Sequence, residues 1–359
     1  MKKAIALVMA ACLAFSLVAC GGASSSTASS TSTASSAAAS SEAASSEAAS
    51  TATEAGVKTG MAIVSSTDST KSADADADGL AQVDSTVAAV LVGEDGKIIS
   101  CKLDVAQNKI PVKADGSFDT TLTFKSKQEL QGDYGMKKAS GIGKEWYEQA
   151  DAFAEYVVGM TADEVRAIET NPDAHNGPVD ADIAASCTMG VTDFIEAIAQ
   201  ATENAQVLGA SADDTLTLGL ETNMDSSKLP ADNEGTGLVQ TDTTYAAVTT
   251  GADGKITSSI WDCTQAKFDV TEAGEVTSKG DVVSKQVQKE AYGMAKASQV
   301  GEWYQQADAY AAWLVGKTAD DVAAIEVGGD HNGPTDADIA ASCTMNVTEF
   351  NAAVEKALA

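Results

Sequence analysis

The chain has 359 residues, enough for about two domains of ~150 residues each. It carries 52 Asp and Glu against 23 Lys and Arg, a formal net charge of -29. This acidity argues against nucleic acid as a partner and against electrostatic docking onto an anionic membrane, because both need clustered basic residues. Two histidines are too few for a histidine-based zinc site, and six cysteines are too few for a disulfide scaffold.

The N-terminus has the organisation of a lipoprotein export signal. Lys2 and Lys3 precede an apolar stretch, 4–18, that is too short for a typical membrane span. Small residues then lead to Cys20, an arrangement typical of a bacterial lipobox. We therefore expect 1–19 to be a signal peptide, Cys20 to be lipidated, and the protein to lie on the extracytoplasmic face of the cell membrane. The alternative is a signal peptide that is cut elsewhere.

The segment after Cys20 has the composition of a flexible tether. Thirty of the 36 residues in 21–56 are Ser, Thr or Ala, so the segment has no large apolar side chain to bury. We expect a disordered tether over 20–56 with a typical reach of ~35 Å.

The remaining chain is an internal duplication. Ten residues, Asp180–Met189, recur without change as Asp336–Met345. Shorter Tyr-Gly-Met and Glu-Trp-Tyr segments recur at nearly the same offset. A period near 157 residues is too long for a solenoid repeat, so the sequence predicts two whole domains, 57–205 and 206–359.

Both copies have the same expected order of elements. Two β-rich segments, 86–92 and 97–105, flank a Glu-Asp-Gly turn, and 117–124 is a further candidate strand. Apolar residues at helical spacing then predict a helix over 146–157. Capping signals at Thr161 and Thr318 predict a second helix, and a last helix is expected to begin near Val191. Strands followed by helices indicate an α+β fold, in which helices pack on one side of an antiparallel sheet.

The repeated ten-residue block is the strongest candidate for a functional site. It places Thr188 and Thr344 shortly before the last helix of each copy, where main-chain N–H groups and the helix dipole favour a phosphate. The alternative is that both threonines are helix N-caps, which duplication alone would preserve.

The same block resembles the flavinylation motif of FMN-binding domains in exported bacterial electron-transfer proteins. In that family a segment Asp-x-x-Ser-Gly-Ala-Thr receives FMN, and a flavin transferase links the FMN phosphate to the last Thr. The matching positions here are Asp182 and Thr188 in the first copy and Asp338 and Thr344 in the second. Ala-Ser-Cys, which includes Ser186 and Ser342, replaces the usual Ser-Gly-Ala in both copies.

The resemblance implies a membrane-anchored electron carrier with two covalent FMN groups. Its implied partners are the flavin transferase, a membrane quinol-oxidising electron donor, and soluble or mineral electron acceptors. Such a carrier is not an enzyme with its own substrate. The alternative is a non-redox surface lipoprotein that acts as a ligand-binding or interaction module, and a hydrolase that uses Cys187 with His175 is a third hypothesis.

Other repeated residues are candidates for the flavin environment. Aromatic and thioether side chains could form an apolar face for the ring. These are Tyr134, Met136, Trp146 and Tyr147, with Tyr292, Met294, Trp303 and Tyr304 in the second copy. Both tryptophans are also candidates for core anchors. The matched histidines, His175 and His331, are either contacts near the phosphate or turn residues.

Four cysteines remain after Cys12 and Cys20 are set aside. Disulfides Cys101–Cys187 and Cys263–Cys343 are conceivable in an oxidising compartment, but the two strand cysteines do not align between the copies. The alternating aspartates of 74–78 match half of a calcium loop. Because Ser85 stands where that loop needs a glutamate, a solvated acidic loop is expected and no metal site is predicted.

Overall fold

The structure is a computed structural model that describes residues 56–329 and 331–359. The expected signal peptide 1–19, the lipidation at Cys20 and nearly all of the tether 20–56 lie outside these residues. Within the described ranges, every helix is too short or too polar to cross a membrane.

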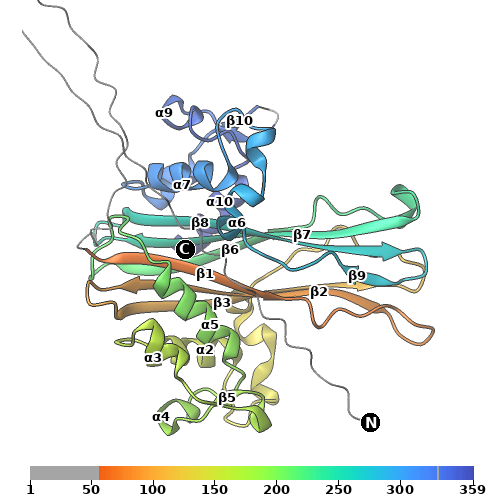
Figure 1. Cartoon of the computed structure of the whole chain (residues 1–359), viewed down its shortest axis with the longest axis horizontal. Coiled ribbons are helices and arrows are strands. Elements are labelled where there is room, and N and C mark those ends of the chain that lie inside the picture. The colour runs from red at the N-terminus through yellow and green to blue at the C-terminus, as the bar shows by residue number, and fades with distance from the viewer. Residues whose placement is uncertain (1–55, 330) are drawn as a thin grey trace, which may run out of the picture. The chain divides into compact units, whose positions relative to one another are not determined.

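The first repeat begins with a three-stranded antiparallel sheet (Figure 1). Its strands are β1 (Lys58–Ser66), β2 (Gly79–Val92) and β3 (Ile98–Val112), in that spatial order. The expected Glu-Asp-Gly turn joins β2 to β3, with Gly96 in the left-handed conformation that the turn requires. The two predicted strands are therefore confirmed and are longer than expected, whereas β1 was not predicted.

The helices of the first repeat follow its sheet. The main helices are α2 (Trp146–Tyr156) and α5 (Thr192–Glu203). Between them lie α3 (Ala162–Arg166), the strand pair β4 (Thr170–Asn171) and β5 (Gly177–Pro178), and α4 (Ala181–Ala184). A short helix, α1 (Lys127–Leu130), precedes them. Thr161 and Glu164 form the predicted capping box of α3.

The second repeat has a similar order of elements, with one additional strand, β9 (Val276–Ser278), at the edge of its sheet. Its sheet contains β6 (Thr215–Asn223), β7 (Thr236–Thr250), β8 (Ile256–Thr271) and β9. Its helices and short strands are α6 (Lys285–Gln288), α7 (Trp303–Trp313), α8 (Ala319–Ala323), β10 (Val327–Gly328), β11 (Gly333–Pro334), α9 (Ala337–Ala340) and α10 (Thr348–Leu358). The predicted α+β fold in two tandem copies is confirmed.

The candidate strand at 117–124 is wrong, because this segment is irregular. The carboxylates of Asp115 and Asp119 accept the main-chain N–H groups of Ser117 and Thr121, at 3.0 and 2.8 Å. Such local turns compete with strand pairing for the same N–H groups. Phe118 is nevertheless buried and contributes to the core, although its segment does not pair as a β-strand.

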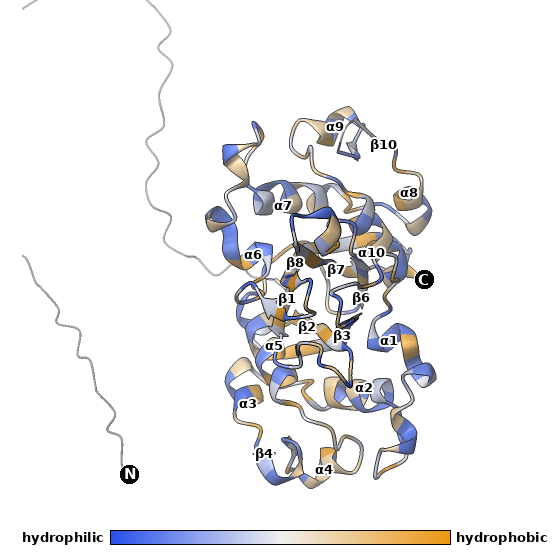
Figure 2. Ribbon diagram, turned by 90° about the vertical axis from the view of Figure 1, so that its right-hand side faces the viewer, coloured by the Kyte–Doolittle hydropathy of each residue, from blue (hydrophilic) through white to orange (hydrophobic). Residues whose placement is uncertain are grey.

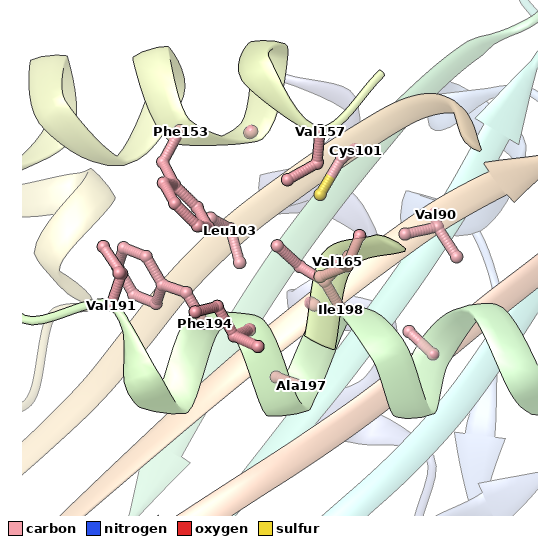
Figure 3. Close-up of a cluster of buried hydrophobic side chains, with 14 of the residues drawn as sticks. Val90, Cys101, Leu103, Phe153, Val157, Val165, Val191, Phe194, Ala197 and Ile198 are labelled. Atoms are coloured by element: carbon pink, nitrogen blue, oxygen red, sulfur yellow. The ribbon is translucent and has the colours of Figure 1, made fainter. Parts of the chain in front are cut away.

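One face of each sheet packs against the helices of its own repeat. In the first repeat Leu103 from β3 contacts a cluster that includes Phe153 of α2 and Phe194 and Ile198 of α5 (Figure 3). Burial of each large apolar side chain contributes ~1.5–3 kcal/mol. The contact between this sheet face and the helices is the core that the spacing of apolar residues in the sequence predicted.

The other face of each sheet packs against the sheet of the other repeat. Val87, Ala89 and Leu91 of β2 share a buried cluster with Leu220 and Tyr245 of the second sheet. In Figure 2 the long strands of the two sheets, β1–β3 and β6–β8, lie between α2 and α7. Residues of β2 alternate between the two faces of the sheet. One set packs against the helices of its own repeat and the other against the second sheet, so both faces of the strand are buried.

Polar contacts also join the two sheets. Thr59 Oγ1 lies 2.7 Å from Ser258 Oγ, and Asn108 Nδ2 donates to Thr243 Oγ1 at 3.1 Å. These buried groups would be costly to desolvate without partners. The sequence did not predict this contact between the repeats.

Each long C-terminal helix approaches the first strand of its sheet very closely. A Cβ atom added at Gly60 in β1 would lie 1.9 Å from the Ala201 carbonyl oxygen of α5. A Cβ atom added at Gly219 in β6 would lie 1.9 Å from the Ala353 carbonyl oxygen of α10. Glycine therefore sets the spacing between helix and sheet in both repeats.

Candidate functional site

The block shared by the two repeats forms a short helix followed by an exposed loop. Asp180 caps α4, because its carboxylate accepts the Asp182 N–H at 2.9 Å. The chain then turns, and the Cys187 N–H donates to the Ile183 carbonyl oxygen at 2.8 Å. Ile183 and Cys187 are buried in the helical core, which leaves Thr188 on the surface. The second repeat has the same arrangement in Asp336, Asp338, Ile339, Cys343 and Thr344.

The two threonines do not cap the last helix of their repeats. The N-cap residues of α5 and α10 are Val191 and Val347, and neither makes a side-chain capping hydrogen bond. The interpretation of Thr188 and Thr344 as helix N-caps is therefore wrong.

A buried glutamine holds each threonine in place. Gln149 of α2 is 1% exposed, and its Oε1 accepts the Thr188 N–H at 2.9 Å and the Thr188 hydroxyl at 3.4 Å. Gln306 of α7 is also 1% exposed and makes the same two contacts with Thr344, at 3.0 and 3.2 Å. The threonine main chain is thus fixed from inside the protein while its side chain remains exposed.

The amide nitrogen of each glutamine anchors a second loop. Gln149 Nε2 lies within 3.2 Å of both Ser140 Oγ and the Lys144 carbonyl oxygen. Gln306 Nε2 has matching partners, Ser298 Oγ at 3.0 Å and the Gly301 carbonyl oxygen at 3.1 Å. Sequence reasoning missed both glutamines, although they recur at the offset of the duplication.

A lysine is enclosed by two aromatic rings in each repeat. Lys127 Nζ lies 5.0 Å from the Tyr134 ring centroid and 5.4 Å from that of Trp146. In the second repeat the corresponding distances are 4.8 Å for Lys285 with Tyr292 and 5.2 Å for Lys285 with Trp303. All four distances are in the range of cation–π attraction. The aromatic residues were predicted as candidates for a flavin face because they recur in both copies, but the lysines were not predicted.

A buried aspartate fixes the lysine-bearing segment to the sheet. Asp104 Oδ1 accepts the N–H groups of Val105 and Gln128, at 2.7 and 3.0 Å. Asp262 Oδ1 makes the same contacts with Cys263 and Gln286. Burial raises the pKa of Asp104 to about 7 and that of Asp262 to about 6, although hydrogen bonds from neighbouring groups oppose this.

These two carboxyl groups should make the folded state less stable as the pH rises. Their folded pKa values exceed the ordinary value of 3.8, so between about pH 4 and 7 the folded state binds more protons than the unfolded state. The stabilisation that the two protonated carboxyl groups give to the folded state is fully present below about pH 4. It is lost as the pH rises through their folded pKa values of about 6 and 7. We expect the variant Asp104→Asn, Asp262→Asn to lose less stability than the parent between pH 5 and 8, by ~1 kcal/mol or more. Urea unfolding at pH 5 and pH 8 measures this difference. An equal loss of stability in the variant and the parent would contradict the prediction.

A cavity of about 870 Å³ lies beside Thr344 in the second repeat. Four residues proposed from the sequence as flavin contacts line it together: Thr344, His331, Trp303 and Met294. Lys285 and Gln306 also line it, so the enclosed lysine and the buried glutamine meet the threonine at one site. Asp338, Ser342 and Tyr292 are not among its lining residues.

The remaining residues of the motif have local structural roles. Ser186 and Ser342 donate their main-chain N–H groups to Ile183 and Ile339, each at 2.8 Å, and so hold the turn after α4 and α9. Asp182 is exposed, as is its counterpart in the second repeat.

The two histidines lie in equivalent exposed loops. His175 is in the left-handed region, with a φ of 55°, at the end of a 3₁₀ turn. Its next residue, Asn176, accepts the Val191 N–H through its carbonyl oxygen at 3.2 Å. His331 lines the cavity beside Thr344. The structure thus gives His175 a turn position and gives His331 a position at the site.

The tryptophans that were candidates for a flavin face are core residues. Trp146 and Trp303 are both buried in the helical cores of their repeats. Trp303 also contributes to the cavity wall, together with Met294. Tyr304 instead donates its hydroxyl to Glu290 on the surface, at 2.9 Å.

The four cysteines of the described region are buried free thiols, so neither conceivable disulfide is formed. They occupy apolar positions in the helical cores, where a cysteine acts as a small hydrophobe. Burial raises the pKa of Cys187 to about 11, which works against a thiolate nucleophile at neutral pH. The residues involved are Cys101, Cys187, Cys263 and Cys343.

The acidic segment that matches half of a calcium loop closes on its own backbone. Asp74 Oδ1 accepts the N–H groups of Asp76 and Ala77, both at 2.8 Å. In the part of the chain that the structure describes, no group of three or more metal-ligating side chains gathers at one place.

Comparisons with known family models, curated proteins and solved structures find no match to this chain. The functional assignment therefore rests on the site and on the repeated motif.

Proposed function

We propose that this protein is an electron carrier that holds FMN through phosphoester bonds to Thr188 and Thr344. The observation that carries the proposal is the repeated pairing of an exposed threonine with a buried glutamine. This pairing holds the main chain of an exposed threonine in a fixed position in both repeats, which is what a site of covalent attachment requires.

The threonine geometry is compatible with an ester. When the ester forms, the hydroxyl loses its proton, an oxygen–phosphorus bond forms, and an activated flavin nucleotide loses its leaving group. The hydroxyl then no longer donates to Gln306, but the Thr344 N–H still does, at 3.0 Å. The loop therefore keeps its anchor after modification.

The residues that line the cavity beside Thr344 fit a flavin nucleotide. Its volume lies within the usual ~300–1,000 Å³ of small-molecule sites. The cation of Lys285 would balance the negative charge of the phosphate or of the reduced ring. Trp303 would supply an aromatic wall. When bound, FMN supplies reversible redox chemistry, while the protein attaches, orients and shields it.

The exported, tethered location expected from the sequence suits this function. A covalent bond would keep a soluble cofactor from being lost outside the cell. The proposed electron donor is a quinol-oxidising partner in the membrane, and the proposed acceptors are soluble or mineral oxidants. A tether of the 20–56 type would let the folded repeats move between the two while the anchor keeps their local concentration high.

Intact mass of the full chain, secreted by a host that has a flavin transferase, tests the proposal. We expect two additions of ~440 Da each, with peptide mapping to Thr188 and Thr344, and a yellow protein. Colourless protein with both threonines unmodified would contradict the proposal.

A further inference from the structure

The first repeat contains a second kind of cavity, of about 560 Å³, beside Tyr156. Its lining residues come from the end of α2, from α3 and from the segment that leads into α4, which Figure 1 shows on the helical side of the first sheet. None of them lines the cavity beside Thr344. The volume of this Tyr156 cavity is within the ~300–1,000 Å³ of small-molecule sites, and the electron-carrier proposal does not use it.

The wall of the Tyr156 cavity combines apolar side chains with carboxylates. The apolar side chains are those of Met160, Ile168 and Val179. The carboxylates are those of Glu164, Glu169 and Asp180. In the part of the chain that the structure describes, no basic side chain forms an ion pair with any of the three. Such a wall suits a guest with a hydrocarbon stem and a cationic end.

Two hydrogen bonds hold the Asp180 carboxylate at the cavity. Its Oδ1 accepts the Asp182 N–H at 2.9 Å, and its Oδ2 accepts the Tyr156 hydroxyl at 2.9 Å. These bonds keep the pKa of Asp180 below its usual value, so the group is charged at neutral pH. The aromatic ring of Tyr156 is therefore fixed next to a negative charge.

The second repeat places a lysine of its own at the matching position. Met160 and Lys317 have the same place in the backbone, because the carbonyl oxygen of each accepts the N–H of the first residue of β3 or β8, at 2.9 Å. The ring that matches Tyr156 is Trp313, since these residues end α2 and α7. Lys317 Nζ lies 3.8 Å from the centroid of the Trp313 ring, well within the range of cation–π attraction.

The Lys317 ammonium also lies close to a carboxylate. Asp321, which matches Glu164, has a lowered pKa because the N–H and hydroxyl of Thr318 donate to it and because Lys317 adds a nearby positive charge. The second repeat thus contains an ammonium group between an aromatic ring and an acidic side chain. The first repeat keeps the ring and the carboxylates but has the uncharged side chain of Met160 instead of the lysine.

We propose that the Tyr156 cavity binds an alkylammonium group, either on a lysine side chain of another polypeptide or on a free primary amine. The ammonium would lie against the Tyr156 ring and near the carboxylates, and its stem would lie on the apolar wall. In the second repeat Lys317 supplies this group from within the chain. The first repeat therefore takes it from outside, and this binding does not depend on a bound flavin.

The probe for this site is Nα-acetyl-lysine methylamide, with Nα-acetyl-norleucine methylamide as the uncharged counterpart. ¹⁵N–¹H spectra of the full chain follow the main-chain signals of Gly159, Glu169 and Val179, which line the cavity. We expect the lysine probe to give saturable shifts of these signals with a millimolar Kd. The norleucine probe should bind about fivefold more weakly or less, because it lacks the charge. Equal affinities would overturn the proposal.

Exchanging the matched residues between the repeats gives a reciprocal test. Met160→Lys gives the first repeat an ammonium of its own and should abolish binding of the lysine probe there. Lys317→Met removes the ammonium from the second repeat and should add a second site, detected as saturable shifts of the Gly316 signal. Unchanged binding in Met160→Lys, or no second site in Lys317→Met, would overturn the proposal.

Glu169→Gln covers the case in which Met160→Lys disturbs the core that Met160 contacts. The Glu169 side chain can lose its charge while the main-chain carbonyl oxygen still accepts the Val179 N–H at 3.0 Å. We expect two- to fivefold weaker binding of the lysine probe. Glu155→Gln is the matched control, because Glu155 is exposed on α2 but does not line the cavity. Equal weakening by both substitutions would show that only the overall charge attracts the probe, and would overturn the site.

Butylammonium distinguishes the two sources of the group. It has the stem and the charge of a lysine side chain but no peptide main chain. Tighter binding of the lysine probe would support a lysine of another polypeptide as the guest. Equal or tighter binding of butylammonium would support a free amine. All these variants keep Thr188 and Thr344, so the flavin content of the secreted protein reports separately on the proposed function.

Discussion

Replacing Thr188 and Thr344 together by valine is expected to remove all covalently bound flavin from the secreted protein. Valine keeps the shape of threonine, and its main-chain N–H can still donate to the buried glutamine, as in the parent at 2.9 and 3.0 Å. The loop should therefore keep its place and lose only the oxygen that would form the ester. Each single variant should lose about half of the flavin absorbance and ~440 Da of mass.

Two nearby threonines provide matched controls. Thr192 and Thr348 are the first residues of α5 and α10, and both are exposed. Their replacement by valine should leave the flavin content of the protein unchanged. Full yellow colour in the Thr188→Val, Thr344→Val protein would show that the flavin is attached elsewhere or is held without an ester.

A single methyl group at Gly60 or Gly219 is expected to destabilise the protein strongly. The added Cβ would lie 1.9 Å from a helix carbonyl oxygen in either case, well inside van der Waals contact. Because that oxygen belongs to the backbone of a packed helix, the helix would have to move away from its sheet. We expect Gly60→Ala and Gly219→Ala each to lower the free energy of unfolding by ~3 kcal/mol or more.

Gly132→Ala is the control for this effect. No heavy atom beyond its chain neighbours lies within 4 Å of a Cβ placed there. Urea unfolding should give the parent midpoint for this variant and much lower midpoints for the two strand variants. Parent-like stability of Gly60→Ala would mean that α5 is packed less tightly on β1 than the structure has it.

The elements with strong local signals could be predicted from the sequence. The Glu-Asp-Gly turn, the helical spacing after Trp146 and the capping box at Thr161 all depend on near neighbours, and all are present. The contact between the two sheets depends on distant residues. A signal for it existed in the nearly unbroken apolar run of 87–92, since a strand with one solvated face would alternate. The strand prediction at 117–124 failed because carboxylates near Phe118 accept main-chain N–H groups and form local turns.

The site could be predicted only in part. The motif led only to the proposal of Thr188 and Thr344, because their neighbourhood depends on side chains from other elements. Gln149 and Lys127 recur as Gln306 and Lys285, so the duplication itself contained the signal that would have found them. Neither belongs to a known motif, and a glutamine within a helical pattern looks like a surface residue. Gln149 can be buried because the loop with Ser140 offers its amide nitrogen an acceptor and the loop with Thr188 offers its amide oxygen a donor.

The packing of the two sheets against each other gives this polypeptide the organisation of a homodimer whose subunits have been joined by one chain. Either half alone would present a strand surface with Val87, Leu91 or Tyr245 to water, so it would have to aggregate or pair with another copy. Fusion of the halves removes the need for identical partners. One half can then change, as at Leu103 and Trp261, while the other preserves the shared architecture.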